Sequence, residues 1–367
     1  MTIPKLQVNI GINNEISLKE RINKFANLVQ FCVSRNVDIL CDMSVDIESV
    51  NERNSILKSA NIPFCKVPIY DYYLRYGEKY NYCIDKNAFI DLLETETENS
   101  PSYILLHSAF TRKIYNDLML SNRLIKMSSR GGGIIYKHFD TSTDDNPLYV
   151  YFDTILKILN KKNITLLLGA ATRPGSICDG FDNIFKSEML VQTELLKIAK
   201  YYNSRVIIEG IGHCRISELI SWIDYAHELF NDTPLKPLPI VTDISAGLDH
   251  ISHGIAVYEC IKRGVEYLCC ITPAEHLGAP TLTDIELAID TIKIISHIIN
   301  LDESNESSLL DFKISLARAN NDWENVFKFS INPSLAKSKY IKLNKNRSIS
   351  CSMCGDLCPK ILTNKIK

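Results

Sequence analysis

Short apolar runs alternate with longer amphipathic stretches from the start of this chain to about residue 300. The apolar runs have the length of buried strands, and the stretches between them have helical spacing. Strands that alternate with helices form parallel sheets, so the pattern predicts a (β/α)8 barrel, with an open doubly wound sheet as the alternative.

The pattern gives nine strand positions, one more than a barrel holds, so one of them should lie outside the barrel. The nine runs are residues 6–10, 38–43, 64–69, 103–106, 124–127, 164–168, 206–208, 240–244 and 267–271. The helices expected between them include residues 18–34, 187–202, 215–229 and 283–299.

The composition is that of an ordinary soluble globular protein, with 46% hydrophobic and 23% charged residues. A net charge of −2 argues against nucleic acid or a membrane as a partner. Apolar runs fall short of the roughly 20 residues of a membrane helix, and the N-terminal residues read as a strand rather than a signal peptide. Most of the 12 cysteines lie in apolar, strand-like runs, as reduced thiols do, so we expect a cytoplasmic protein.

The chain is expected to have three parts. The polar segment 301–308 should end the barrel domain, which we place at residues 1–300. A helical pattern at 309–324 and a Lys- and Asn-rich linker at 337–350 give a helical extension and linker over 301–345. Residues 346–367 form a cysteine-rich tail, which such a tether would allow to reach the mouth of a barrel.

Three cysteines, Cys351, Cys354 and Cys358, lie within eight residues of the tail. A 4Fe-4S cluster takes one thiolate per iron, so three thiolates would leave one iron open to a substrate or cofactor. Cys-x2-Cys is also half of a zinc site, although the sequence after Cys358 supplies no His or Cys to complete it. The spacing favours the iron–sulfur cluster, and zinc or unused thiols are the alternatives.

Polar and ionisable residues follow nearly every predicted strand. In a parallel barrel the loops after the strands open on one face, and function collects there. The residues at these positions are Asn9, Met43, Tyr70, His107, Ser129, Arg130, Gly131, Arg173, Glu209, His213, Asp243, Glu275 and His276. The sequence therefore predicts that they meet at one mouth.

Arg130 precedes three glycines, a pattern that suggests an anion site. Backbone N–H groups of such a loop can approach a phosphate closely, and the guanidinium can donate paired hydrogen bonds. The alternative is an ordinary Gly-rich turn, because the spacing matches neither a P-loop nor a dinucleotide fold. Arg173, which precedes Pro174-Gly175-Ser176, gives a similar but weaker signal.

His213 and His276 both follow strands, so their imidazoles could share one metal ion. A single His after a strand is more often a hydrogen-bonded structural group, and His250 and His253 compete for the same role. The carboxylates expected to orient ligands or to move protons in catalysis are Glu209, Asp243 and Glu275.

The chain resembles the phosphomethylpyrimidine synthase family of thiamine biosynthesis, an atypical group of radical S-adenosylmethionine enzymes. The motifs that carry the resemblance span almost the whole chain, in the order VNIG, VPIY, SRGG, RPGS, IEGxGH, TDIxxGxDHI, TPxEHLG and CSMCG. The resemblance implies a (β/α)8 barrel in a homodimer, with the cluster segment closing over the partner's active site. It also implies a lyase reaction on 5-aminoimidazole ribotide, which yields hydroxymethylpyrimidine phosphate.

The resemblance also assigns roles, position by position. The family's substrate-contacting residues fall on Asn9, Met43, Tyr70, His107, Ser129, Arg130, Gly131, Arg173 and Glu209. Its divalent metal ligands, for zinc or iron, fall on His213 and His276, and its 4Fe-4S ligands fall on Cys351, Cys354 and Cys358. S-adenosylmethionine is the implied cofactor, and flavodoxin or ferredoxin is the implied reducing partner.

The sequence departs from the family pattern at three places, and the N-terminal domain that usually precedes VNIG in the family is absent from it, so we expect a shortened, diverged member. The family has Gly-Asp-Gly-Leu-Arg-Pro-Gly at the positions of residues 169–175 of this chain, which read GAATRPG. Ala170 therefore stands in place of the family's substrate-contacting aspartate. A substrate-side tyrosine aligns with Leu235, and the second gap between the tail cysteines is one residue shorter than in Cys-x2-Cys-x4-Cys. Phosphomethylpyrimidine synthase is the expected function. The alternatives are 5-hydroxybenzimidazole synthase for the cobamide lower base, an inactive paralog, and a zinc-tailed aldolase-like barrel.

Overall fold

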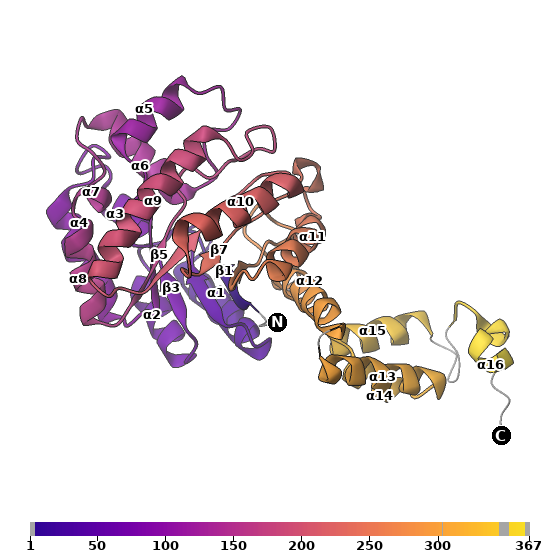
Figure 1. Ribbon diagram of the computed structural model, residues 1–367. Helices are drawn as coiled ribbons and strands as arrows, with labels where there is room; N and C mark the ends of the chain where they lie inside the picture. The colour runs from indigo at the N-terminus through magenta and orange to yellow at the C-terminus, as the bar shows by residue number, and fades with distance from the viewer. Residues whose placement is uncertain (1–3, 303, 345–351, 364–367) are drawn as a thin grey trace. The chain divides into compact units, whose positions relative to one another are not determined.

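Eight parallel strands form the centre of the structure (Figure 1). The computed structural model describes residues 4–302, 304–344 and 352–363. From β1 to β7 each strand pairs with the next one along the chain, β1 also pairs with β8, and β7 and β8 lie close together. The strands are β1 (Lys5–Ile10), β2 (Ile39–Asp42), β3 (Phe64–Lys66), β4 (Tyr103–Leu106), β5 (Thr165–Leu168), β6 (Val206–Glu209), β7 (Leu235–Lys236) and β8 (Tyr267–Cys269). The sheet is a nearly closed barrel, which confirms the predicted (β/α)8 fold.

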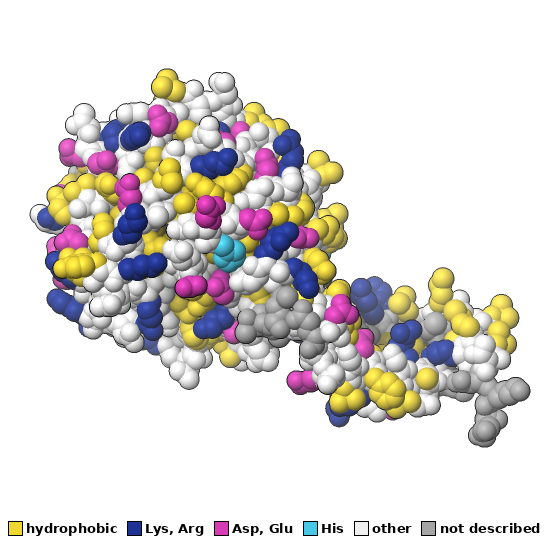
Figure 2. All heavy atoms as spheres, viewed as in Figure 1, with side chains coloured by type: hydrophobic (Ala, Val, Ile, Leu, Met, Phe, Trp, Pro, Cys, Tyr) yellow, Lys and Arg dark blue, Asp and Glu magenta, His cyan; other side chains and the backbone are white. Residues whose placement is uncertain are grey.

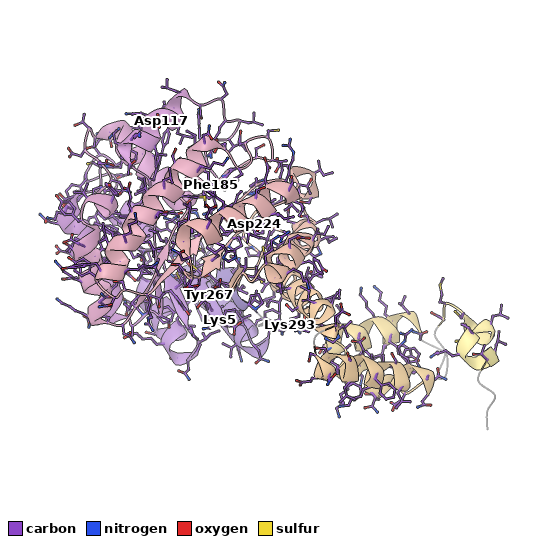
Figure 3. The ribbon with its side chains drawn as sticks, in the orientation of Figure 1. Lys5, Asp117, Phe185, Asp224, Tyr267 and Lys293 are labelled. Atoms are coloured by element: carbon purple, nitrogen blue, oxygen red, sulfur yellow. The ribbon has the colours of Figure 1, made fainter. Side chains whose placement is uncertain are left out.

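The pairing of β1 with β8 joins the first and last strands of the barrel. Lys5 and Tyr267, both labelled in Figure 3, are register partners, and Lys5 Nζ lies 5.7 Å from the centroid of the Tyr267 ring. The strands β2 to β7 are buried along their whole length, because helices cover the outside of the barrel. Their apolar content therefore forms the core.

Helices follow the strands around the barrel, as the spacing predicts. The first of them begins at a capping box, in which Ser17 and Glu20 satisfy each other's backbone N–H groups. The helices are α1 (Leu18–Ser34), α2 (Val50–Ser59), α3 (Pro68–Tyr76), α4 (Lys86–Glu98), α5 (Arg112–Leu120), α6 (Arg130–Thr141), α7 (Pro147–Val150), α8 (Phe152–Lys161), α9 (Asn183–Tyr201), α10 (Ile216–Phe230), α11 (Asp249–Lys262) and α12 (Leu282–Leu301).

Two of the nine predicted strands are wrong. Residues 124–127 run as an irregular loop, in which the Asp179 carboxylate accepts from the N–H groups of Leu124 and Ile125 at 2.7 and 3.0 Å. Strand β7 lies earlier than the predicted 240–244, where Ile240 forms one isolated bridge and Asp243–Ser245 form the 3-10 turn η1. The proline-rich sequence LKPLP explains this position, because Pro cannot donate to a strand ladder.

The chain divides into two compact units, Thr2–Ile289 and Asp290–Lys367. The first holds the barrel. The second contains α13 (Asn305–Ala319), α14 (Trp323–Phe329), α15 (Pro333–Leu343), the 3-10 turn η2 (Gly355–Leu357) and α16 (Pro359–Thr363). Part of the predicted linker is therefore helical, because 337–343 belong to α15. The division into three parts stays a prediction.

Aromatic packing organises the helical unit. The ring of Trp323 in α14 lies 4.4 Å from that of Tyr340 in α15, centroid to centroid. Lys360 of α16 donates to the carbonyl of Arg318 and to Asn321 Oδ1 at 2.9 Å, and its Nζ lies 5.3 Å from the Trp323 ring centroid. These contacts attach the segment that carries Cys354 and Cys358 to the α13–α14 corner.

The visible surface of the barrel is mixed in charge. Lys, Arg, Asp and Glu side chains are interspersed over the face shown in Figure 2. Among the residues that the structure describes, every helix is too short or too polar to span a membrane.

Buried charges fix the end of β2, next to the barrel mouth. Asp42 Oδ2 accepts hydrogen bonds from Arg53 Nε and from Lys66 Nζ, both at 3.0 Å, and all three side chains are at most 3% exposed. Burial alone would raise the pKa of Asp42, but the charges of Lys66 and Arg53 outweigh it and hold that pKa well below its usual range. Because Asp42 precedes Met43, this network positions the loop that reaches the mouth.

Replacing Asp42 with Ala should lower the free energy of unfolding by about 3 to 5 kcal/mol, because two buried cations lose their carboxylate. The matched control is Glu98→Ala, which breaks the exposed 2.8 Å pair of Glu98 with Lys162 and should cost less than about 1 kcal/mol. Urea unfolding followed by circular dichroism measures both. Equal losses in the two variants would contradict the structural role of Asp42.

Candidate active site

Two cavities open among the loops that follow the barrel strands. The first has a volume of about 470 Å³ and the second about 590 Å³. Both are lined by Ser128, Glu275 and His276, so these residues stand between the two cavities. Five predicted substrate residues line the first cavity: Asn9, Met43, Tyr70, Arg130 and Arg173. The second cavity is lined by the predicted residues His213 and Asp243.

The other predicted substrate residues lie outside the cavity linings. His107, Ser129, Gly131 and Glu209 are buried. His107 Nε2 and Ser129 Oγ are 2.9 Å apart. Burial lowers the pKa of His107 to about 4, so its ring is neutral near pH 7. These four buried residues support the wall of the first cavity.

Arg130 reaches the first cavity from the start of α6. Its Nη1 donates to the Met43 carbonyl oxygen at 2.8 Å, and its guanidinium carbon lies 5.0 Å from the centroid of the Tyr70 ring. Burial raises the pKa of Tyr70, so its hydroxyl stays protonated. The guanidinium therefore ties the loop after β2 and the first turn of α3 to α6.

The glycines after Arg130 belong to the first turn of α6, whereas the sequence suggested a loop. Ser129 is the N-cap, and its Oγ accepts from the Gly132 N–H at 3.0 Å. A Cβ atom at Gly131 would lie 2.3 Å from the His107 ring, and one at Gly132 would lie 2.3 Å from the Ala171 carbonyl oxygen. Glycine is required here because the helix start packs against both.

Glu209, at the end of β6, lies between two cations. Its Oε2 accepts from Arg173 Nη1 at 3.0 Å and from the Ala170 N–H at 3.2 Å, while its Oε1 lies 3.3 Å from Lys236 Nζ. Burial would raise the pKa of Glu209, but the charges of Lys236 and Arg173 lower it below its usual value. Glu209 is therefore ionised and holds Arg173 in place.

Glu188 of α9 holds the loop that carries Arg173. Its Oε1 accepts from the Ala171 N–H at 2.7 Å, and its Oε2 accepts from the N–H and the Oγ1 of Thr172, both at 2.6 Å. The side chain is fully buried. Three donors thus converge on one carboxylate directly before Arg173.

His213 and His276 face each other in the second cavity. Their Nε2 atoms are 2.8 Å apart. His213 Nδ1 lies 2.6 Å from Asp243 Oδ1, and Asp243 Oδ2 accepts from the Ile177 N–H at 2.9 Å. Asp243, in the 3-10 turn η1 after β7, therefore fixes the direction of the His213 ring and is itself held by the loop after β5 through Ile177.

Glu275 and His276 occupy a constrained turn after β8. His276 has a φ of +58°, a left-handed conformation that a residue with a side chain adopts at a cost. Burial raises the pKa of Glu275, although the nearby His276 and Arg173 work against this rise. The Glu275 carboxyl thus stands where the two cavities meet.

The tail cysteines are described in part. Cys351 lies outside the described residues. Cys354 is exposed and Cys358 is 4% exposed. The 3-10 turn η2 separates them, with hydrogen bonds from the Leu357 N–H to the Cys354 carbonyl and from the Cys358 N–H to the Gly355 carbonyl. A 3-10 turn rises about 2 Å per residue, so the two Cα atoms lie within about 8 Å.

Glu188 and Lys236 support the site but were not predicted from the sequence. Glu188 stands on the buried face of α9 with Phe185 and Gln192, and a carboxylate at such a position is the signal that could have identified it. Lys236 escapes because the sequence places the seventh strand too late in the chain.

Glu188→Gln should weaken the loop of residues 169–173. An amide offers one acceptor oxygen where three donors converge, so we expect a loss of about 2 kcal/mol in stability and faster amide hydrogen exchange in this loop. Glu194→Gln, on the exposed face of the same helix, is the control and should change neither quantity. Unchanged exchange in the Glu188 variant would show that the loop does not depend on this carboxylate.

Comparisons with known proteins show the family to which the chain belongs. A model of the radical SAM ThiC family matches residues 2–365. The phosphomethylpyrimidine synthase of Carboxydothermus hydrogenoformans is 32% identical over 98% of this chain and 84% of that protein. The enzymes of that name from Clostridioides difficile and Pyrococcus furiosus are 32% and 30% identical, over 99% and 96% of this chain and 83% and 82% of those proteins. The chain therefore belongs to the radical SAM ThiC family.

Proposed function

We propose that this protein is a phosphomethylpyrimidine synthase, a radical S-adenosylmethionine lyase acting on 5-aminoimidazole ribotide for thiamine biosynthesis. The product is 4-amino-5-hydroxymethyl-2-methylpyrimidine phosphate. The observation that carries the proposal is the first cavity, where Asn9, Met43, Tyr70, Arg130 and Arg173 come together from β1 and from the loops and helices that follow β2, β3, β4 and β5. Relatives that bear this name and match nearly the whole chain support it.

The first cavity suits a ribotide in size and charge. Its volume of about 470 Å³ lies within the usual range for small-molecule sites. Arg130 and Arg173 place two guanidinium groups on its wall, and guanidinium groups bind phosphate through paired hydrogen bonds. Asn9 and Tyr70 add neutral polar groups that would orient the ribose or the base.

The tail fits an iron–sulfur cluster by its donor chemistry. Cys354 and Cys358 offer two thiols on one turn, and Cys351 would complete the set of three. When bound, the cluster would supply the electron that cleaves S-adenosylmethionine. The residues of the cavities would then bind the ribotide, orient it and exclude water.

The second cavity fits a divalent metal held by His213 and His276. Two ring nitrogens at about 2.1 Å from one ion lie roughly 3.0 to 3.4 Å apart, close to the separation seen here. Asp243 would orient the His213 ring, as carboxylates do behind metal-bound histidines. Among the described residues, no group of three or more His, Cys, Asp or Glu side chains is arranged as ligands, so water or the cofactor would complete the coordination.

Glu275 is the proposed proton-transfer group. It lines both cavities, and burial raises its pKa above the usual value, which favours a carboxyl that exchanges a proton with a ligand. A proton on the Glu275 carboxyl could pass to a ligand in either cavity. Asp243 and Glu209, by contrast, are engaged in holding His213 and Arg173.

Closure of the mouth is proposed to involve a second copy of the chain. Leu124, Ile125 and Leu277 form an exposed apolar rim on the second cavity. The tail presents exposed Met353 and Leu357 beside its cysteines. A homodimer in which the tail covers the partner's mouth would bury both surfaces, with flavodoxin or ferredoxin as the electron donor.

A second candidate function is 5-hydroxybenzimidazole synthesis from the same ribotide. It is favoured by Ala170 and Leu235, which are both fully buried and stand where the resemblance leads us to expect an aspartate and a tyrosine. Little free energy is needed to redirect a reaction, because about 1.4 kcal/mol between two barriers changes a product ratio tenfold.

Product analysis tests the proposal. Anaerobically reconstituted protein, given 5-aminoimidazole ribotide, S-adenosylmethionine and a reductant, should yield the pyrimidine phosphate by mass spectrometry. Cys358→Ala should reduce cofactor cleavage to background, because a ligand of the cluster is lost. Cys178→Ala, an exposed cysteine of the barrel, is the control and should retain activity.

Other outcomes separate the alternatives. The benzimidazole as sole product would replace the first function with the second. Cofactor cleavage without consumption of the ribotide would contradict both. Full activity of the Cys358 variant would contradict the cluster assignment.

Metal analysis tests the second cavity. His213→Gln should lower the bound zinc or iron outside the cluster from about one ion per chain to well below half, because one of two protein ligands is lost. His227→Gln is the control, since His227 contacts the Arg263 carbonyl on the outside of the barrel. Elemental analysis of protein purified with the tail cysteines replaced removes the cluster iron from the count. Equal metal content in both variants would remove His213 as a ligand.

A further inference from the structure

A buried lysine stands inside the barrel, below the first cavity. Lys236 ends β7, and its side chain is 1% exposed. Its Nζ lies 3.3 Å from Glu209 Oε1 and donates to Gln7 Oε1 at 3.3 Å. A charged group is expensive to bury without a partner, so this contact is the reason that Lys236 can remain charged in the barrel interior.

Glu209 is the carboxylate that balances Lys236 in the described part of the chain. Gln7 is neutral, and burial raises the pKa of the neighbouring Cys269 thiol to about 12, so neither supplies negative charge. Burial opposes the charge on Lys236, but Glu209 raises its pKa above the usual value. The pair is therefore ionic.

The same carboxylate also contacts Arg173. Glu209 gives Oε1 to Lys236 and Oε2 to Arg173 Nη1. One negative charge thus faces two cations, which leaves a surplus of one positive charge. Arg173 is the member of this group that lines the first cavity, and Arg130 adds a second guanidinium there. Without Lys236, Glu209 and Arg173 would form a neutral pair.

We propose that Lys236 is a positioning residue that makes the first cavity selective for a phosphate-class anion. Lys236 pairs with Glu209 Oε1 and compensates the negative charge of that carboxylate. The positive charge of the Arg173 guanidinium therefore remains available to attract a ligand. The surplus positive charge is neutralised when an anionic group binds between Arg173 and Arg130. This inference deepens the proposed function and rests on it for the ribotide, but the anion preference is a property of the cavity itself.

The test compares three variants with the unaltered protein: Lys236→Met, Glu209→Gln and the double variant. Two probes are used. Orthophosphate binding is followed by the rise in melting temperature, and 5-aminoimidazole ribotide binding is followed by calorimetry. Circular dichroism without ligand verifies that each variant is folded.

If Lys236 acts through its charge, the variants should bind phosphate in a different order than if Lys236 only supports the fold. Lys236→Met should weaken orthophosphate and ribotide binding about tenfold, equal to about 1.4 kcal/mol. Glu209→Gln should strengthen orthophosphate binding, and the double variant should return to within about threefold of the unaltered protein. If Lys236 only filled space, Glu209→Gln would not improve binding and the double variant would not recover.

The outcomes decide the inference separately from the proposed function. Unchanged phosphate affinity in folded Lys236→Met, or a double variant as weak as Lys236→Met, overturns the inference. If Lys236→Met does not fold, the double variant must bind orthophosphate more weakly than Glu209→Gln, or the inference falls. If orthophosphate follows the expected order but the ribotide does not bind, the inference stands and the proposed function falls. If neither probe binds the unaltered protein, the inference falls.

Discussion

The parallel pairing of β1 with both β2 and β8 is the constraint on which the rest of the structure depends. It brings the first and last strands together, so the loop that follows each strand opens at the same mouth. Asn9, at one end of the sequence, and His276, near the other end of the barrel, thereby line the same cavity. Residues that are 267 positions apart meet because one strand pairs on both sides.

Buried charges then set the details of that mouth. Asp42, Glu188 and Glu209 are all fully or nearly fully buried, and each accepts hydrogen bonds from two or more partners. A buried carboxylate is tolerated only when its partners are in place, so each one fixes the groups around it. These carboxylates therefore hold in place the loops after β2 and β5, which carry Met43 and Arg173. The site is held together because a buried carboxylate without its hydrogen-bond partners would cost free energy.

Much of the barrel and its mouth could be predicted from sequence. Seven of the nine predicted strand positions overlap strands of the structure, because apolar runs such as Leu166–Leu168 are visible without knowledge of neighbours. The strand at Leu235–Lys236 could not be placed, since two residues give no periodicity and a buried lysine reads as a surface residue. Residues after strands could be proposed for the site, but Glu188 acts from a helix, where its place on the buried face is the one sequence signal, and its three hydrogen bonds define what it holds.

The proposed function requires that the ribotide and the metal occupy separate, adjoining cavities, which meet at Glu275 and His276. Crystals of the reconstituted protein with 5-aminoimidazole ribotide, measured with anomalous diffraction at the zinc and iron edges, test this most directly. The account predicts an ion between His213 Nε2 and His276 Nε2 and a ribotide phosphate between Arg130 and Arg173. An ion elsewhere, or a ribotide bound outside the first cavity, would contradict it.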